Sequence, residues 1–124
     1  MAPRRTASVA ALLCVAACTT PALPMEEPRK AEGIVIHPYA MHEQCVQLAS
    51  GERLDYRYEA SEPLHFEIRY RDAGAVLAPL VRDESRNDSG IFVAAATRDY
   101  CMAWQAGAAG AMLGYRVVRR AAAP

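Results

Sequence analysis

The feature that most constrains the fold is a strict alternation of apolar and polar side chains in the middle of the chain. Apolar residues occupy every second position over 54–58, with charged residues between them, and the pattern returns over 64–70. Successive side chains of a β-strand point to opposite faces, so each run predicts a strand with one buried and one exposed face. The intervening segment 60–63 ends in a proline and predicts a break between the two strands.

Other apolar runs predict six more strands, at 34–37, 45–48, 76–81, 91–94, 100–104 and 113–118. Turn residues rich in Gly, Asn and Asp separate several of them. Pro79 lies inside its run and has no N–H for a ladder, which indicates an edge strand. About eight short strands without an amphipathic helix predict an all-β fold, a small antiparallel β-sandwich or jelly roll.

The N-terminus has the layout of a signal peptide. Arg4 and Arg5 precede an apolar run over 9–17, which is far shorter than the ~20 residues that cross a bilayer. The run ends in VAAC at 15–18, which resembles the bacterial lipobox, where the cysteine sulfur takes a diacylglycerol. We therefore expect residues 1–17 to be a lipoprotein signal peptide and Cys18 to be the lipidated first residue of the mature protein. An ordinary Ala-x-Ala cleavage, with Cys18 incidental, is the alternative.

Lipidation would anchor the protein to a membrane through Cys18, since two or three acyl chains hold stably. Thr19 follows the cysteine, and the absence of Asp there resembles lipoproteins sorted to the outer membrane. The expected location is the bacterial cell envelope, at the periplasmic face of the outer membrane.

The segment after the lipobox lacks any apolar period. Residues 19–33 carry three prolines and a cluster of charges, which predicts that 18–33 is a disordered tether reaching about 20 Å from the lipid surface. We expect the sandwich over 34–119 and a short tail over 120–124.

Two of the four cysteines can form a disulfide in the mature protein. Cys14 leaves with the signal peptide and Cys18 is lipidated, so Cys45 and Cys101 are expected to form a disulfide in an oxidising compartment. Strand parity sets both opposite the apolar residues of their own strands. This predicts a bridge on the outer face of one sheet with Trp104 in the core. The alternative is a bridge through the core, which would leave an aromatic stripe exposed.

Four short motifs give the domain a family resemblance: EQCV at 43–46, GERL at 51–54, SGIF at 89–92 and YCMAW at 100–104. Over about 45–117 the chain resembles the GOLD domain of secretory cargo receptors. The resemblance implies a β-sandwich with one disulfide that is used for protein contacts and not for catalysis. The coiled coil, membrane helix and cytoplasmic tail of those receptors find no counterpart, so only the fold and the binding-module character are implied.

Composition and motifs argue against several activities. Without Arg4 and Arg5 the chain carries 12 basic and 14 acidic residues, interspersed in the sequence, so no nucleic-acid partner is predicted. No serine lies in a G-x-S-x-G context, and GAAG at 107–110 lacks the Lys and Ser/Thr of a phosphate loop. We predict no catalytic residue and no cofactor, and we do not expect an enzyme.

His37 and His42, with Met41 between them, are the residue types that suit copper. Surface histidines of a loop are the simpler interpretation, and we predict no metal site. The expected function is a membrane-anchored, non-catalytic module that binds a protein or an envelope component of unspecified identity. The alternatives are a periplasmic inhibitor of an envelope-attacking enzyme, with 82–90 as its one long polar loop, and a weak copper-binding protein.

Overall fold

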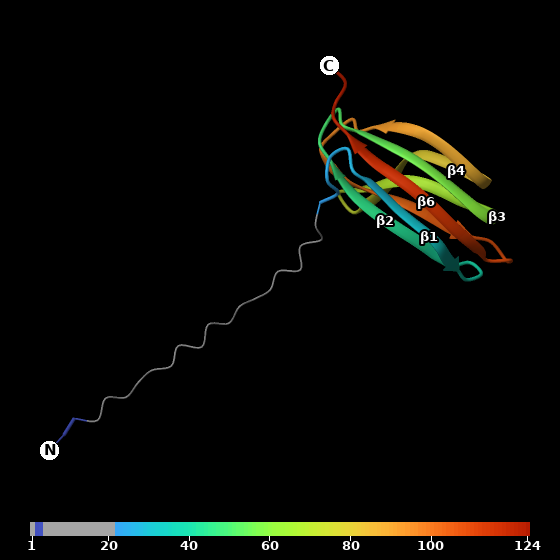
Figure 1. Cartoon of the computed structure of the whole chain (residues 1–124), viewed down its shortest axis with the longest axis horizontal. Helices are drawn as coiled ribbons and strands as arrows, with labels where there is room; N and C mark the ends of the chain where they lie inside the picture. The colour runs from blue at the N-terminus through green and yellow to red at the C-terminus, as the bar shows by residue number, and fades with distance from the viewer. Residues whose placement is uncertain (1, 4–21) are drawn as a thin grey trace.

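The computed structural model describes residues 2–3 and 22–124 and shows an all-β domain (Figure 1). Cys18 and nearly all of the predicted signal peptide lie outside the described residues, so the lipidation stays a prediction. The domain has six strands, which are β1 (Pro28–Ile36), β2 (Met41–Leu48), β3 (Arg53–Asp72), β4 (Ala75–Val93), β5 (Arg98–Ala106) and β6 (Ala111–Arg120).

A long hairpin, β3–β4, joins the two halves of one continuous six-stranded sheet. We call sheet I the set of β1, β6, the first half of β3 and the last half of β4, in that order. We call sheet II the set of β2, β5, the second half of β3 and the first half of β4. All pairings between the named strands are antiparallel, which confirms the predicted fold class.

The structure has six strands instead of eight because two pairs of predicted strands are continuous. The predicted break at 60–63 is wrong, since β3 runs through it. Residues 53–60 pair with β6, whereas residues 64–69 pair with β5, and the register against β4 shifts between Glu59 and Leu64. Extra residues of this kind bend a strand without ending it, and they give Pro63 a position where a missing N–H is tolerated.

The predicted loop at 82–90 is also wrong, because these residues lie within β4. They are polar because this part of the strand pairs only with β3 and most of its side chains are exposed. The edge position predicted from Pro79 is confirmed.

The core lies between the sheets and is built from the apolar side of each alternating run. Tyr56 and Tyr58 of sheet I and Phe66 of sheet II are at most 2% exposed. Trp104 is fully buried and stacks on Phe66 and Tyr115, with ring centroids 5.3 and 4.8 Å away. Aromatic side chains supply large buried areas, which matter in a domain of this size.

The predicted disulfide and its position are confirmed. Cys45 of β2 and Cys101 of β5 are bonded and stand directly opposite in adjacent strands of sheet II. Cys45 is exposed while Tyr100, Met102 and Trp104 are buried, so the bridge lies on the outer face. The alternative with an exposed aromatic stripe is excluded.

The predicted tether is wrong for its second part. Leu23 is buried, Met25 forms a bridge with Arg119, and β1 begins at Pro28. The ordered domain therefore extends from about residue 23 to Arg120, and residues 121–124 form the exposed tail. The apolar pattern missed this segment because β1 is an edge strand that buries few side chains.

Candidate functional site

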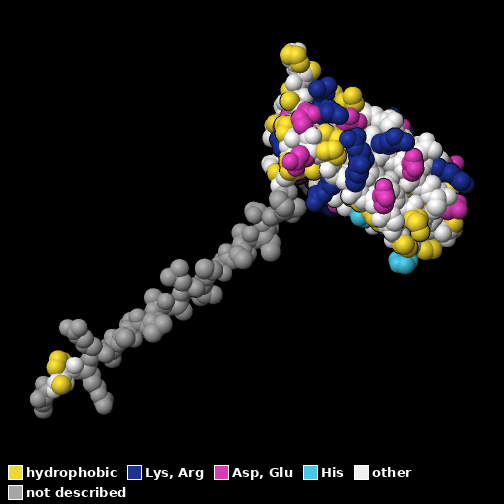
Figure 2. Space-filling model, viewed as in Figure 1, with side chains coloured by type: hydrophobic (Ala, Val, Ile, Leu, Met, Phe, Trp, Pro, Cys, Tyr) yellow, Lys and Arg dark blue, Asp and Glu magenta, His cyan; other side chains and the backbone are white. Residues whose placement is uncertain are grey.

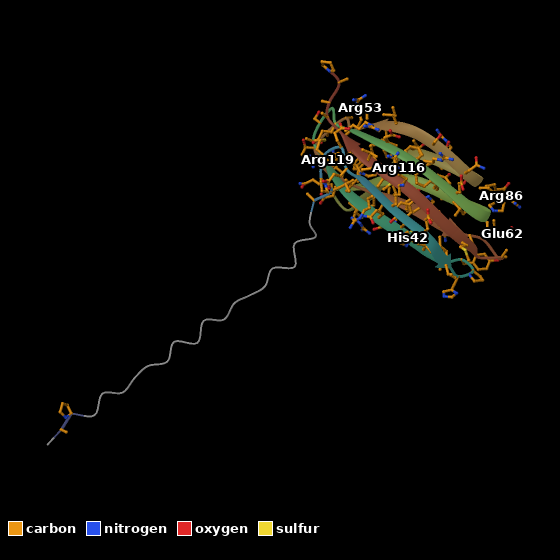
Figure 3. All side chains as sticks on the ribbon, viewed as in Figure 1. His42, Arg53, Glu62, Arg86, Arg116 and Arg119 are labelled. Atoms are coloured by element: carbon orange, nitrogen blue, oxygen red, sulfur yellow. A yellow bond between two sulfur atoms is a disulfide. The ribbon has the colours of Figure 1, made fainter. Side chains whose placement is uncertain are left out.

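Three basic side chains stand next to one another across the outer face of sheet I. Lys30 of β1 pairs in register with Arg116 of β6, and Arg116 pairs with Arg57 of β3. All three are exposed. We call them the cation row. Figure 2 shows Lys and Arg side chains gathered over the middle of this face, and Figure 3 labels Arg116 there.

The core holds the cation row in its outward orientation. Tyr56 and Tyr58 flank Arg57 in β3, and Tyr115 and Val117 flank Arg116 in β6. All four are buried, so the alternate residues between them must face solvent. A slip of one residue in register would bury a guanidinium, which disfavours that alternative.

Hydrogen bonds from two of these tyrosines strengthen the arrangement. Burial, aided by the hydrogen bond to Asp88, raises the pKa of Tyr56 to about 12, and burial also raises the pKa of Tyr58. Both phenols therefore remain protonated donors, Tyr56 to Asp88 and Tyr58 to Ser85, each at 2.9 Å. These bonds fix β4 against β3 behind the exposed face.

A shallow hollow lies beside the cation row and has a volume of about 520 Å³. It is lined by Gly114, which lies two residues before Arg116 on the same face of β6. It is also lined by Gly33, where the pairing of β1 with β6 shifts register. A Cβ at Gly33 would meet nothing within 4 Å, so the surface there is open. The cation row lines one rim of the hollow, and Met112 lines another.

Apolar side chains occupy both ends of this face. Val35 and Met112 pair in register beyond the hollow, and Ile91 and Val93 of β4 lie at the opposite end. Each is 54–62% exposed. Together with the cation row and the hollow they define what we call the sheet I face.

The charges of the sheet I face are only partly compensated. Arg120 pairs with Asp55 at 3.1 Å and with Glu26 at 2.7 Å, so one guanidinium is shared by two carboxylates and compensates one of their two negative charges. Arg57 contacts Glu59 at 3.3 Å, but both side chains are more than 70% exposed, where an ion pair is weak and screened. Among the residues that the structure describes, Lys30 and Arg116 form no ion pair within 4 Å, and Glu32 at the hollow forms none either.

The outer face of sheet II differs in that most of its charges are paired. Arg69 contacts Glu43 and Glu67, and His65 contacts Asp83. Glu43 lies beside the disulfide, and in the described part of the chain Glu43, Cys45 and Cys101 form the single group of three potential metal ligands. Because both sulfurs are in the disulfide, this group offers one carboxylate and no thiolate.

The residues considered for copper are not brought together. His37 is exposed before the turn, and Met41 faces outward, where Arg69 donates to its sulfur. His42 points inward, with its ring centroid 5.9 Å from that of Trp104 and 5.8 Å from that of Tyr115. Nε2 of His42 and Nε1 of Trp104 are both buried without a hydrogen-bond partner within the described structure.

Sequence reasoning missed the cation row. Its members are far apart in the chain, and Arg57 and Arg116 each lie between uncharged residues, so the basic residues read as dispersed. The signal that would have found them is the pairing of β6 between β1 and β3, which no local pattern contains.

No family model matches the chain, and no curated protein matches it. Within residues 2–3 and 22–124, no helix is long and apolar enough to span a membrane.

Proposed function

We propose that the protein is a lipid-anchored, non-catalytic binding module of the bacterial envelope, with a GOLD-like sandwich that binds an anionic partner through the sheet I face. The observation that carries this proposal is the cation row, three exposed basic side chains in register on adjacent strands. Like charges directly opposite one another destabilise a sheet, so the row costs the fold some stability. A partner that supplies negative charge would remove this repulsion.

The hollow and the apolar ends of the face add to the case. A surface that combines charge, a depression and exposed apolar side chains offers a partner both specificity and buried area. The alternative function, an inhibitor of an envelope-attacking enzyme, depended on a protruding loop at 82–90. These residues lie in β4, so that loop is not present.

Site-specific photo-crosslinking in intact cells tests the proposal. A photoreactive residue replaces Ser89, which is exposed and in register with Arg57, and a second protein carries it at Gln47, exposed on the outer face of sheet II. We expect a light-dependent adduct at position 89 and not at 47. The adduct should be lost when Arg116→Glu is added, and an adduct that is indifferent to this charge reversal would contradict the proposal.

A further inference from the structure

The sheet I face raises the question of which anionic partner it fits. We infer that this partner is the lipid surface that carries the chain's own anchor, so that the outer face of sheet I lies against anionic headgroups and the disulfide face points away. This inference rests on the proposed function and specifies its partner.

The length of chain between the predicted anchor and the fold supports this. Five peptide steps separate Cys18 from Leu23, which at full extension span about 18 Å. Arg119 donates a hydrogen bond of 3.2 Å to the carbonyl oxygen of Leu23, and Met25 bridges to the same arginine at the end of β6. The ordered chain thus begins beside sheet I, and its edge strand β1 follows directly.

This short connection keeps the domain at the membrane. A partner on a short link is present at a high effective concentration, so even weak surface contacts become occupied. The tether predicted from the sequence has 16 peptide steps between Cys18 and Ile34, which at full extension span roughly 55 Å and would let the domain stand clear of the lipid.

The chemistry of the sheet I face matches an anionic bilayer surface. Each Lys or Arg near such a surface strengthens binding by about fivefold. Apolar side chains that flank the basic residues enter the boundary between headgroups and acyl chains. Val35 and Met112 at one end and Ile91 and Val93 at the other provide such side chains on both sides of the cation row. The hollow lined by Gly114, Met112 and the cation row gives room for a lipid headgroup.

Two methionines of the chain make a built-in reporter of orientation. Met112 is 54% exposed on the sheet I face, and Met41 is 41% exposed on the outer face of sheet II. The lipidated mature protein is added to vesicles of phosphatidylethanolamine and phosphatidylglycerol, or to vesicles of phosphatidylcholine alone. Oxidation of each methionine by chloramine-T, which does not enter the bilayer, is followed by peptide mass spectrometry.

We expect the rate of Met112 oxidation relative to that of Met41 to fall several-fold on the anionic vesicles and to change little on phosphatidylcholine. The double variant Lys30→Gln/Arg116→Gln should lose this protection. Arg71→Gln is the matched control, because it removes an exposed arginine from the sheet II side, and it should keep the protection.

An unchanged ratio on anionic vesicles overturns the inference. In that case a protein adduct from the residue at position 89, sensitive to Arg116→Glu, would leave the proposed function standing with a protein partner. If no such adduct forms either, both the membrane-docking inference and the proposed function are wrong.

Discussion

Gly110 lies in the turn between β5 and β6 under two constraints that only glycine meets. Its φ is +66°, and a Cβ on it would stand 2.8 Å from the carbonyl oxygen of Ile36. We expect Gly110→Ala to lower the free energy of unfolding by about 2–3 kcal/mol through backbone strain and the clash. Gly107→Ala in the same turn is the control, since its Cβ would meet nothing within 4 Å. Urea denaturation compares them, and equal midpoints would contradict the expectation.

A second effect at the residue scale concerns Glu52, which is 7% exposed. Arg119 donates hydrogen bonds of 2.6 and 2.8 Å to its carboxylate, and the backbone amide of Ala49 donates a third of 2.9 Å. The bond from Arg119 lowers the pKa of Glu52 below its ordinary value of 4.5, against the opposing effect of burial.

Because the pKa is lower in the folded state, the Glu52 carboxylate adds stability that is fully present above pH 4.5 and is lost as the pH falls through the lowered pKa. Glu52→Gln should destabilise the domain by about 1–3 kcal/mol near neutral pH. It should also flatten the fall in stability below pH 4.5. Denaturation at a series of pH values checks both effects, and parallel curves for the two proteins would argue against them.

The cation row leads to an expectation of opposite sign. Arg116 stands between two basic neighbours, so Arg116→Gln removes both repulsions and should raise the free energy of unfolding by about 0.2–1 kcal/mol. Added salt should reduce the difference in the free energy of unfolding between this variant and the unaltered protein, since salt screens exposed charges. A loss of stability in this variant would mean that the arginine is held by contacts that outweigh the repulsion.

What the sequence revealed at the residue scale depended on local information. The alternation around Cys45, Cys101 and Trp104 was enough to orient all three correctly. The cation row was out of reach, because it depends on the order of strands in sheet I. For the same reason a pattern of charges along the chain says little about the pattern across a sheet.

At the scale of the elements, the alternating runs predicted the faces of the strands better than their ends. The bend of β3 near Pro63 resembles a turn in sequence, since both need residues that leave the ladder. Polar residues at 82–90 suggested a loop, although an edge strand exposed on much of its surface has the same composition. The predicted strand at 34–37 matches only the end of β1, and residues 28–33 escaped notice because Ile36 is the one buried residue of this strand.

The disulfide between β2 and β5 is expected to contribute much of the stability. The double variant Cys45→Ala/Cys101→Ala should lose about 4 kcal/mol in the chain-entropy model, given the sequence separation of 56 residues. Guanidinium denaturation checks this, and unfolding of the unaltered protein in excess reductant should give the same midpoint. A loss of well under 1 kcal/mol in the free energy of unfolding would contradict the expectation. It would mean that the disulfide adds little restraint to the unfolded chain.

For the whole molecule, the lipid anchor is the prediction with the widest consequences. Cys18→Ala should abolish incorporation of labelled palmitate and release the protein from the membrane fraction or leave it as an unprocessed precursor. Cys14→Ala is the matched control and should label normally, because Cys14 is expected to leave with the signal peptide. Unchanged labelling of Cys18→Ala would end the lipoprotein assignment, and the membrane-docking inference with it.

The position of β6 has a consequence for how the chain is made. The last strand in the sequence lies between β1 and the first half of β3, so sheet I has no continuous ladder until residues 111–120 are present. Pairings this distant along the chain form late and slowly. A polypeptide still missing residues 111–120 therefore cannot complete sheet I, although all the strands of sheet II precede this segment. If the chain is exported as we propose, closure of the domain waits until β6 has passed through the protein-conducting channel.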